Sequence, residues 1–363
     1  MKNKIKLGVC GAFPGPIGGT TILVQQHYEA FLHSEDFEVS KYDFLSHDFL
    51  KSFPKIRPFY LCFKSVLQND VSTINVSLRG FRYLLLFICI LKLVFNNKVI
   101  IFRYYGGDAT SLYGKLLYRM TWLLVKYSKF QGPILTETLS NIAYFDQLGL
   151  RTYQLTNSRP EPREQINKTT NDVMKCIFIG QMKKSKGVLD IIRAVDENMQ
   201  IQIDLYGPLE WDISLSELQS SPKVRYCGII PLGRAPTIIR EYDCMIFPTR
   251  WPGESHAGVV IEAYSVGVPV IAYEWQALSE IISDGQTGYL IPPADIPELS
   301  RKLKALSENP EQLTELSLEA RKRFVNYFTD QISFERTRTI IMGEIYEDYG
   351  DDCVQKYMLN GHD

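Results

Sequence analysis

The sequence lacks the features that mark several classes of protein. Its seven cysteines are odd in number and form no C-x-x-C pair, which predicts buried, reduced thiols rather than a disulfide framework or a zinc site. The longest apolar run, 83–95, contains Lys92 and falls short of the roughly 20 residues that a membrane-spanning helix needs. The segment 1–15 has too few apolar residues before its glycines and prolines for a signal peptide. We therefore expect a cytoplasmic protein whose apolar run is a helix buried in the first domain.

The chain also lacks a strong net charge, which is -1 over 363 residues and excludes an obvious nucleic-acid binder. That balance conceals an asymmetry. Residues 1–165 carry 20 Lys and Arg against 12 Asp and Glu, whereas residues 166–363 carry 20 against 29. A basic first half is typical of proteins that contact an anionic membrane surface or a phosphate-bearing acceptor. Two ordinary domains with different isoelectric points are the alternative interpretation.

The order of apolar and polar segments indicates an α/β protein. No internal repeat or low-complexity segment is present, and the chain is too long for one ordinary core. Apolar strand patterns alternate with helical ones, which predicts doubly wound parallel sheets. A polar, proline-rich stretch at 155–172 predicts a linker. We expect two Rossmann-like domains, 1–160 and 173–330, facing each other across a cleft, and a C-terminal helix, 331–363, that returns toward the N-terminal domain.

The stretch PGESHAGVVIEAYS, 252–265, carries the residues that best indicate a function. A helix is expected to begin near Gly258, so its first uncommitted amides belong to Gly258, Val259 and Val260 and form a site for phosphate. Glu262 lies about one turn inside the helix, where a carboxylate suits the two hydroxyls of a ribose. Glu254 lies in the loop before the helix, on the other side of the phosphate. This layout predicts a nucleotide-sugar site.

The same stretch closely resembles the E-x7-E element of retaining glycosyltransferases of the GT-B fold, in particular family GT4. Three further segments support the resemblance. EAYSVGVPVIAYEWQALSEIISDGQTGYLIPPAD is similar to the family's C-terminal signature, CIFIGQMKKSKGVLDIIRAV to its strand, loop and helix with a phosphate-binding lysine, and GAFPGPIGGTT to its N-terminal glycine-rich loop. The similarity spans both domains and is strongest over about 175–295.

The resemblance implies roles for particular residues. Glu262 matches the acid that binds the ribose, and Glu254 matches the acid near the hydroxyls of the donor sugar. Lys186 matches the lysine that neutralises the leaving diphosphate, so Glu254 and Lys186 are the catalytic candidates. Gly18 and Gly19 match the loop that closes over the sugar phosphate. The amides on the diphosphate match those of Gly258, Val259 and Val260.

The sequence departs from the family pattern at two places. Gln181 stands where relatives usually have a donor-binding arginine, and the two lysines that follow it do not reproduce a guanidinium fork. The strand and loop IIFRYYGGDA contain no histidine where many relatives have one, so Arg103 and Asp108 are the candidates to line the cleft there. His256 is a further candidate beside the donor site, where a structural role is the alternative.

The chain contains no Asp-x-Asp triplet, so we expect neither a metal nor a cofactor, with the nucleotide-sugar as substrate. The resemblance implies a hexosyltransferase of surface polysaccharide biosynthesis, with a UDP-sugar as the favoured donor and a glycan or lipid-linked acceptor. We expect it at the inner face of the membrane, in peripheral contact through the basic N-terminal domain. The alternatives are a nucleotide-sugar epimerase of the same fold and an inactive relative that binds nucleotide-sugars. The E-x7-E context argues against the epimerase.

Overall fold

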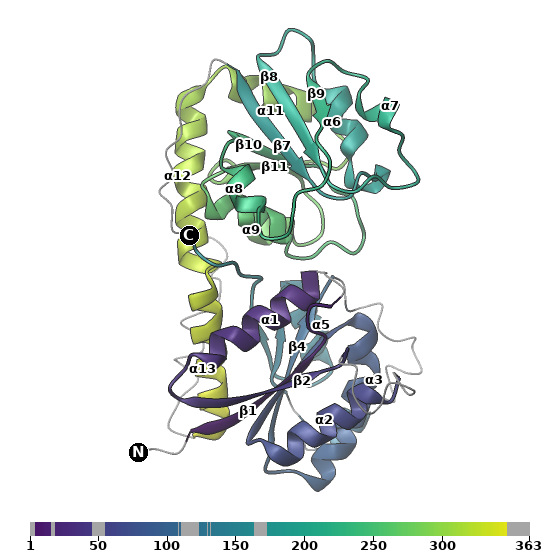
Figure 1. Cartoon of the computed structure of the whole chain (residues 1–363), viewed down its shortest axis with the longest axis vertical. Helices are drawn as coiled ribbons and strands as arrows, with labels where there is room; N and C mark the ends of the chain where they lie inside the picture. The colour runs from purple at the N-terminus through teal and green to yellow at the C-terminus, as the bar shows by residue number, and fades with distance from the viewer. Residues whose placement is uncertain are drawn as a thin grey trace. The chain divides into compact units, whose positions relative to one another are not determined.

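The computed structural model describes residues 4–15, 19–45, 55–107, 109, 123–128, 130, 132–162 and 173–346. The chain forms two compact units. The first comprises Met1–Asn157 together with Asp330–Asp363, and the second comprises Ser158–Thr329. Figure 1 shows that each unit contains one sheet with helices packed on it.

The first unit contains a six-stranded sheet of order β2-β1-β3-β4-β5-β6, in which every pairing is parallel. Its strands are β1 Ile5–Gly11, β2 Phe37–Asp43, β3 Val71–Ser77, β4 Val99–Tyr105, β5 Ile134–Thr136 and β6 Thr152–Gln154. Its main helices are α1 Gly19–Leu32, α2 Arg57–Gln68, α3 Leu78–Val94, α5 Leu139–Gln147 and α13 Asp330–Ile345. The inner strands are buried on both faces, as expected when helices cover a parallel sheet.

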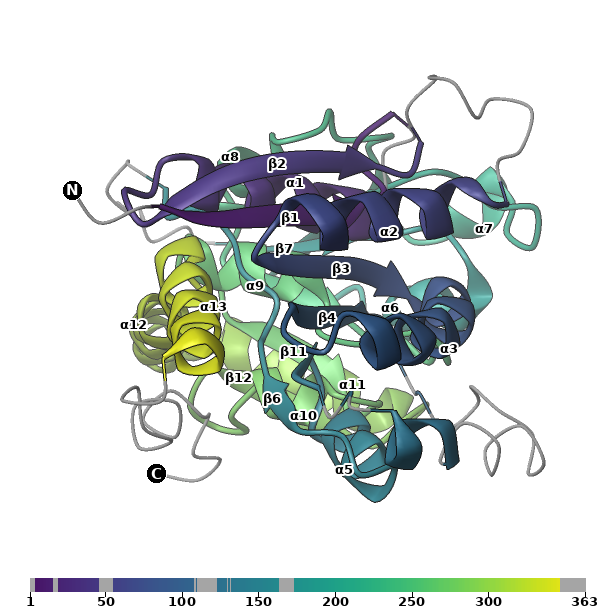
Figure 2. The ribbon, with the colours of Figure 1, turned by 90° about the horizontal axis from the view of Figure 1, so that it is seen from below.

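Two hydrophobic cores lie on the two faces of this first sheet. One joins apolar side chains of the sheet to α1 and α13, through residues such as Val24, Phe31 and Ile341. The other joins the opposite face to α2, α3 and α5, through Cys62 and Phe81 among others. Figures 1 and 2 show α13 and α3 on opposite sides of the strands. The C-terminal helix α13 therefore belongs, with α1, to the helical layer on one face of the first sheet.

The second unit contains a six-stranded parallel sheet of order β12-β11-β10-β7-β8-β9. Its strands are β7 Met174–Ile179, β8 Ile201–Tyr206, β9 Val224–Tyr226, β10 Cys244–Phe247, β11 Val270–Tyr273 and β12 Gly288–Ile291. Its helices are the 3-10 turn η2 Lys184–Lys186 and the α-helices α6 Val188–Ala194, α7 Leu215–Leu218, α8 Ala235–Ile239, α9 Gly258–Ser265, α10 Leu278–Ile281, α11 Ile296–Ser307 and α12 Pro310–Tyr327. The predicted fold class, α/β with two doubly wound parallel sheets, is confirmed.

Local sequence signals explain where several of these helices begin. The side chain of Asp295 accepts a hydrogen bond from the Glu298 amide at the start of α11, and Asn309 does the same at α12. Each cap is followed within two residues by a proline, whose fixed φ and missing N–H suit the first turn. By contrast, α9 begins without any side-chain cap. That difference leaves the amino end of α9 open to another partner.

The predictions for the cysteines and for the apolar run 83–95 are confirmed in part. All six described cysteines are free, and five of them are buried. The apolar run lies in α3, which buries Phe81 and Leu85 but exposes Leu93 and Val94. Among the helices that the structure describes, none is both long and apolar enough to cross a bilayer. The expectation that this helix is buried is therefore correct for one of its faces.

Candidate functional site

The amino end of α9 lies just beyond the carboxyl end of β10, where parallel α/β sheets bind ligands. Gly258 is the first helical residue, and Ala257 precedes it in an extended conformation. The Val260 amide donates to the carbonyl oxygen of Ala257 at 3.0 Å, so it is already committed. No described residue accepts a hydrogen bond from the amides of Gly258 or Val259. Two of the three predicted phosphate-binding amides are thus available in this structure.

Lys186 and Glu254 form a close pair within the second unit. The Lys186 ammonium lies 2.6 Å from Glu254 Oε2, and both side chains are largely buried, at 13% and 12% exposure. The buried Thr249 hydroxyl donates to the same carboxylate oxygen at 2.8 Å. The structure therefore brings both catalytic candidates together and fixes the Glu254 carboxylate from two sides.

A glycine makes this pair possible. Gly187 follows the η2 turn in the left-handed region, with φ of 72°. A β-carbon at this position would lie only 2.0 Å from the carbonyl oxygen of Pro248. Because glycine has no β-carbon, the turn that carries Lys186 can approach the backbone at the end of β10. This close approach places Lys186 beside the loop that holds Glu254.

Glu262 is held by an arginine that the sequence analysis did not single out. Arg159 Nε donates to Glu262 Oε1 at 2.7 Å, and the two side chains are 15% and 20% exposed. The arginine also lies against the first residue of α9, since a β-carbon on Gly258 would be 1.8 Å from Arg159 Nη2. The predicted domain boundary placed Arg159 in the first domain. Arg159 and Glu262 are 103 residues apart in the chain, so no local sequence pattern could predict their contact.

Gln181 and His256 make polar contacts within the second unit. The exposed Gln181 amide donates to Glu210 Oε1 at 2.9 Å. His256 is buried, and its Nε2 lies 3.2 Å from Glu280 Oε2. These contacts favour a structural role for His256, although its place beside the donor stays a prediction. Nearby, the Lys183 ammonium lies 4.3 Å from the centroid of the Trp251 ring.

The predicted residues of the first unit are only partly described. Gly19 is exposed and begins α1, whereas Gly18 and Asp108 lie outside the described residues. Arg103 is 4% exposed, its Nη1 lies 3.2 Å from His27 Nδ1, and its guanidinium lies 5.0 Å from the Tyr105 ring centroid. Such deep burial disfavours direct contact between Arg103 and a ligand. Burial, followed by the positive charge of Arg103, lowers the pKa of His27 well below its usual value.

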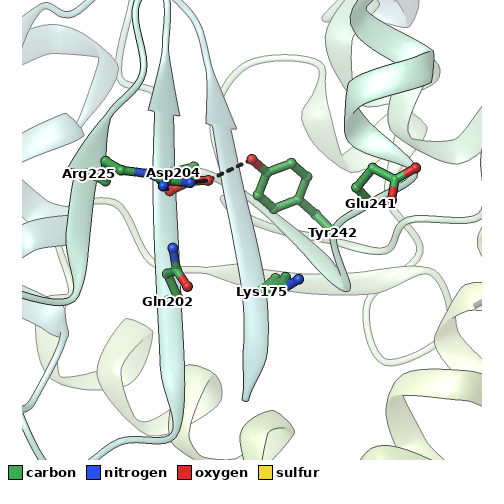
Figure 3. Close-up of a pocket in the computed structure, with 6 residues that line it drawn as sticks. All are labelled: Lys175, Gln202, Asp204, Arg225, Glu241 and Tyr242. Carbon is green, nitrogen blue, oxygen red and sulfur yellow. Dashed lines mark hydrogen bonds and ion pairs between the residues drawn. The ribbon is translucent and has the colours of Figure 1, made fainter. Parts of the chain in front are cut away.

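A small cavity lies at the amino ends of the strands in the second sheet, away from the α9 end. Its volume is about 180 Å³, below the range of about 300–1,000 Å³ that is usual for ligand sites. Figure 3 shows the Tyr242 hydroxyl pointing at Asp204, to which it donates at 2.7 Å. Arg225 pairs with the same carboxylate. These contacts favour a structural polar cluster rather than a nucleotide-sugar site. The lining residues are Lys175, Gln202, Asp204, Arg225, Glu241 and Tyr242.

Within the described part of the chain, no group of three or more His, Cys, Asp or Glu side chains is placed to hold a metal ion. The expectation that the protein needs neither a metal nor a cofactor stays a prediction.

Solved structures of glycosyltransferases share this fold. The crystal structure of Anabaena HepE in complex with UDP-glucose aligns with a TM-score of 0.65 and 14% identity, covering 93% of this chain and 100% of that one. The lipopolysaccharide outer core galactosyltransferase WaaB aligns with a TM-score of 0.69 and 13% identity, covering 94% and 100%. At such identities the likeness shows the fold alone, and that fold is GT-B.

Sequence comparison then defines the family. Residues 159–323 match the family model of glycosyl transferases group 1. The capsular polysaccharide biosynthesis glycosyltransferase CapM of Staphylococcus aureus is 26% identical over 196 residues, which are 52% of this chain and 50% of that protein. The alignments span only about half or less of the first curated relatives. The second unit of this GT-B protein therefore matches the glycosyl transferases group 1 family model, in agreement with the resemblance found in the sequence.

Proposed function

We propose that this protein is a glycosyltransferase that moves a hexosyl group from a nucleotide diphosphate donor to a hydroxyl group of a glycan or lipid-linked acceptor. One observation carries the proposal: a group 1 unit combines an uncapped helix end, α9, with Glu262 beside it and the Lys186–Glu254 pair. The helix end suits a diphosphate, and Glu262 suits a ribose. In the Lys186–Glu254 pair, Glu254 suits the hydroxyls of the donor sugar, and Lys186 suits the departing phosphate.

The chemistry that these groups favour is the departure of a nucleoside diphosphate. The bond between the sugar C1 and the diphosphate oxygen breaks, and a bond from the acceptor hydroxyl oxygen to C1 forms. Negative charge then grows on the leaving oxygen. The amides of Gly258 and Val259 and the ammonium of Lys186 offset that charge without reorganising at the moment of reaction. Glu254, fixed by Lys186 and Thr249, is positioned to accept hydrogen bonds from hydroxyls of the donor sugar.

Retention of configuration and independence from metal are part of the proposal. In a retaining reaction the acceptor attacks on the face from which the diphosphate departs, so its proton can pass to a leaving phosphate oxygen. The helix end and Lys186 supply the positive charge for which other enzymes use a metal ion. Both features rest on the resemblance of the E-x7-E segment to retaining enzymes.

A UDP-sugar is the donor we favour, and a growing surface polysaccharide is the acceptor we favour. Among the structural neighbours, HepE is described in complexes with UDP and with UDP-glucose. Among the sequence relatives, CapM is named for capsular polysaccharide biosynthesis. These descriptions concern those proteins, and they support the proposal for this chain through shared fold and family.

We also propose a cytoplasmic protein whose first unit touches the inner face of the membrane. The segment that contains α2 and α3 suits anionic lipid, because residues 55–98 carry seven Lys and Arg against one Asp, and both helices present apolar side chains to solvent. These helices pack together, since the rings of Phe59 and Phe87 lie 5.3 Å apart. Amphipathic helices that combine apolar and basic residues bind the interfacial region of bilayers. The exposed apolar residues are Tyr60, Phe63 and Leu67 on α2, and Tyr83, Ile90, Leu93 and Val94 on α3.

The donor site is tested by titrating UDP, GDP and ADP into the wild type and a Glu262→Gln variant. The substitution keeps the shape of the side chain but removes the charge that accepts ribose hydroxyls, so we expect affinity to fall about 10–1000-fold. Glu319→Gln is the matched control, because Glu319 is an exposed partner of Lys322 on α12. Equal affinity in the wild type and Glu262→Gln would refute the assigned ribose contact.

A further inference from the structure

Arg159 joins three parts of the second unit at the proposed donor site. Its backbone amide donates to the Phe328 carbonyl oxygen at 2.9 Å, and it forms a β-bridge with Thr329. Its side chain reaches Glu262 and the α-carbon of Gly258. We propose that Arg159 is a ligand of the donor diphosphate that also positions Glu262. This inference rests on the proposed function and adds a residue to it.

The geometry of the guanidinium allows both tasks at once. Nε bonds Glu262 Oε1, while Nη2 lies at the first residue of α9. An ionised carboxylate offers about four acceptor positions, so Glu262 keeps Oε2 for ribose hydroxyls. The planar guanidinium thus extends from the acid expected at the ribose to the amides expected at the diphosphate. A planar fork of N–H donors matches phosphate oxygens well.

The charges at this helix end also favour an anion. A guanidinium beside the amino end of a helix faces the positive end of the helix dipole, which is unfavourable without a counter-charge. Glu262 supplies one negative charge there. Lys186 is paired with Glu254 in the same way, and the neutral Gln181 amide donates to Glu210. These two ion pairs leave the dipole at the uncapped end of α9 uncompensated, so this helix end keeps positive potential for a phosphate group.

The backbone of Arg159 is held before any ligand arrives. Its pairing with Phe328 and Thr329 fixes the main chain, and Nη1 donates to the Ser158 carbonyl oxygen at 2.8 Å. The Arg159 guanidinium is therefore already ordered in the folded protein before a ligand binds. Such preorganisation reduces the entropy lost on binding.

The competing interpretation is that Arg159 only ties the chain after the first unit to α9. Arg321 makes a comparable tie without reaching the amino end. It donates to the Ser265 carbonyl oxygen at the other end of α9 and pairs with Glu161. Arg321→Ala is therefore the matched control for loss of a structural arginine.

The experiment compares uridine with UDP, because only UDP carries the diphosphate. Calorimetry measures UDP and ligand-observed NMR measures uridine on wild type, Arg159→Ala, Arg159→Lys and Arg321→Ala. We expect Arg159→Ala to weaken uridine about 3–10-fold, because Glu262 loses the partner that positions it, and to weaken UDP about 10-fold more than that, because the diphosphate contact is lost as well. Arg159→Lys keeps charge without the fork and should lie between, while Arg321→Ala should change neither affinity.

The outcomes separate this inference from the function on which it rests. Equal losses for uridine and UDP, or no loss for UDP, would overturn the diphosphate contact while leaving the donor site intact. If wild type binds none of UDP, GDP and ADP, the proposed function fails and the inference fails with it. Thermal melting checks folding, and Arg159→Lys carries the comparison if Arg159→Ala does not fold.

Discussion

Lys186 Nζ and Glu254 Oε2 lie 2.6 Å apart although 68 residues separate them in the chain. The contact exists because Gly187 lets the η2 turn approach the end of β10. A largely buried pair of this kind is not by itself evidence of stability, since desolvation offsets much of its attraction. Its position between the α9 loop and a tight turn instead favours a role in binding or catalysis.

Replacing Lys186 by alanine should reduce both donor binding and turnover. The variant removes the ammonium that we assign to the leaving diphosphate, and it leaves Glu254 without its cation. We expect donor turnover to fall about 100–1000-fold, as when one electrostatic contact to a developing charge is lost. UDP release from UDP-sugars measures this, with Lys302→Ala on α11 as control. Unchanged turnover would contradict the role of Lys186.

Replacing Thr249 by valine tests whether Glu254 must be held from both sides. Thr249 donates to Glu254 Oε2 and is fully buried, and valine has nearly the same shape without the hydroxyl. We expect kcat to fall about 3–30-fold with little change in KM, because the variant loses the hydrogen bond that orients Glu254 and the one that the hydroxyl accepts from the Trp251 amide. Thr249→Ser restores a donor and should recover most of the rate. A failure of serine to rescue would indicate a packing effect instead.

The sequence located the acids because both lie on a short loop and helix, where spacing along the chain converts directly into position. Glu254 and Glu262 could therefore be placed around Gly258 before the fold was known. Lys186 required the family resemblance, since its contact with Glu254 depends on a left-handed glycine and a neighbouring strand. Arg159 could not be found this way, because a contact across 103 residues follows from tertiary packing alone.

The alternation of strands and helices likewise predicted two parallel sheets, but it did not fix local hydrogen bonding. Val260 was expected to offer a free amide. Its N–H instead closes a tight turn onto Ala257. A short-range hydrogen bond at the start of a helix depends on the backbone dihedral angles of the preceding residue, here Ala257. Alanine can adopt several backbone conformations, so the residue type does not predict this bond. Arg103 was expected to line a cleft. It is instead buried beside His27 of α1, a position that follows from tertiary packing.

A substitution of Gly187 by alanine should destabilise the second unit strongly. Both Gly187 and Gly285 have φ of 72°, but only Gly187 has backbone within reach of an added β-carbon. Gly285→Ala should cost about 1 kcal/mol for the left-handed conformation alone. Gly187→Ala adds a clash with the Pro248 carbonyl and should cost about 2–4 kcal/mol. Urea unfolding measures the difference, and equal losses would show that the turn relaxes freely.

The stability of the first unit should fall in mild acid because of His27. Burial, and then the charge of Arg103, hold the pKa of His27 well below its usual value. The unfolded chain therefore binds a proton near its ordinary pKa of about 6.5, while the folded chain does not. The stabilisation is complete above that pH and is lost as the pH falls toward the folded pKa. Melting temperatures of wild type and His27→Gln between pH 7.5 and 5 test this. Parallel pH dependence in both proteins would exclude His27 as its source.

Membrane contact should depend on the exposed apolar side chains of α3. Leu93 and Val94 are 58% and 71% exposed near the carboxyl end of that helix, and burying them in the lipid interface would favour binding. The double variant Leu93→Glu with Val94→Glu should reduce co-flotation with anionic vesicles about 10-fold or more, because it removes apolar area and adds charge of the lipid's own sign.

Leu318→Glu on α12 is the control, since Leu318 is similarly exposed, at 67%, in the second unit. Wild-type binding should weaken with salt, because salt screens the positive charges of residues 55–98 around α2 and α3. Flotation that is absent in the wild type, or equal in the double variant, would remove the membrane from the proposal.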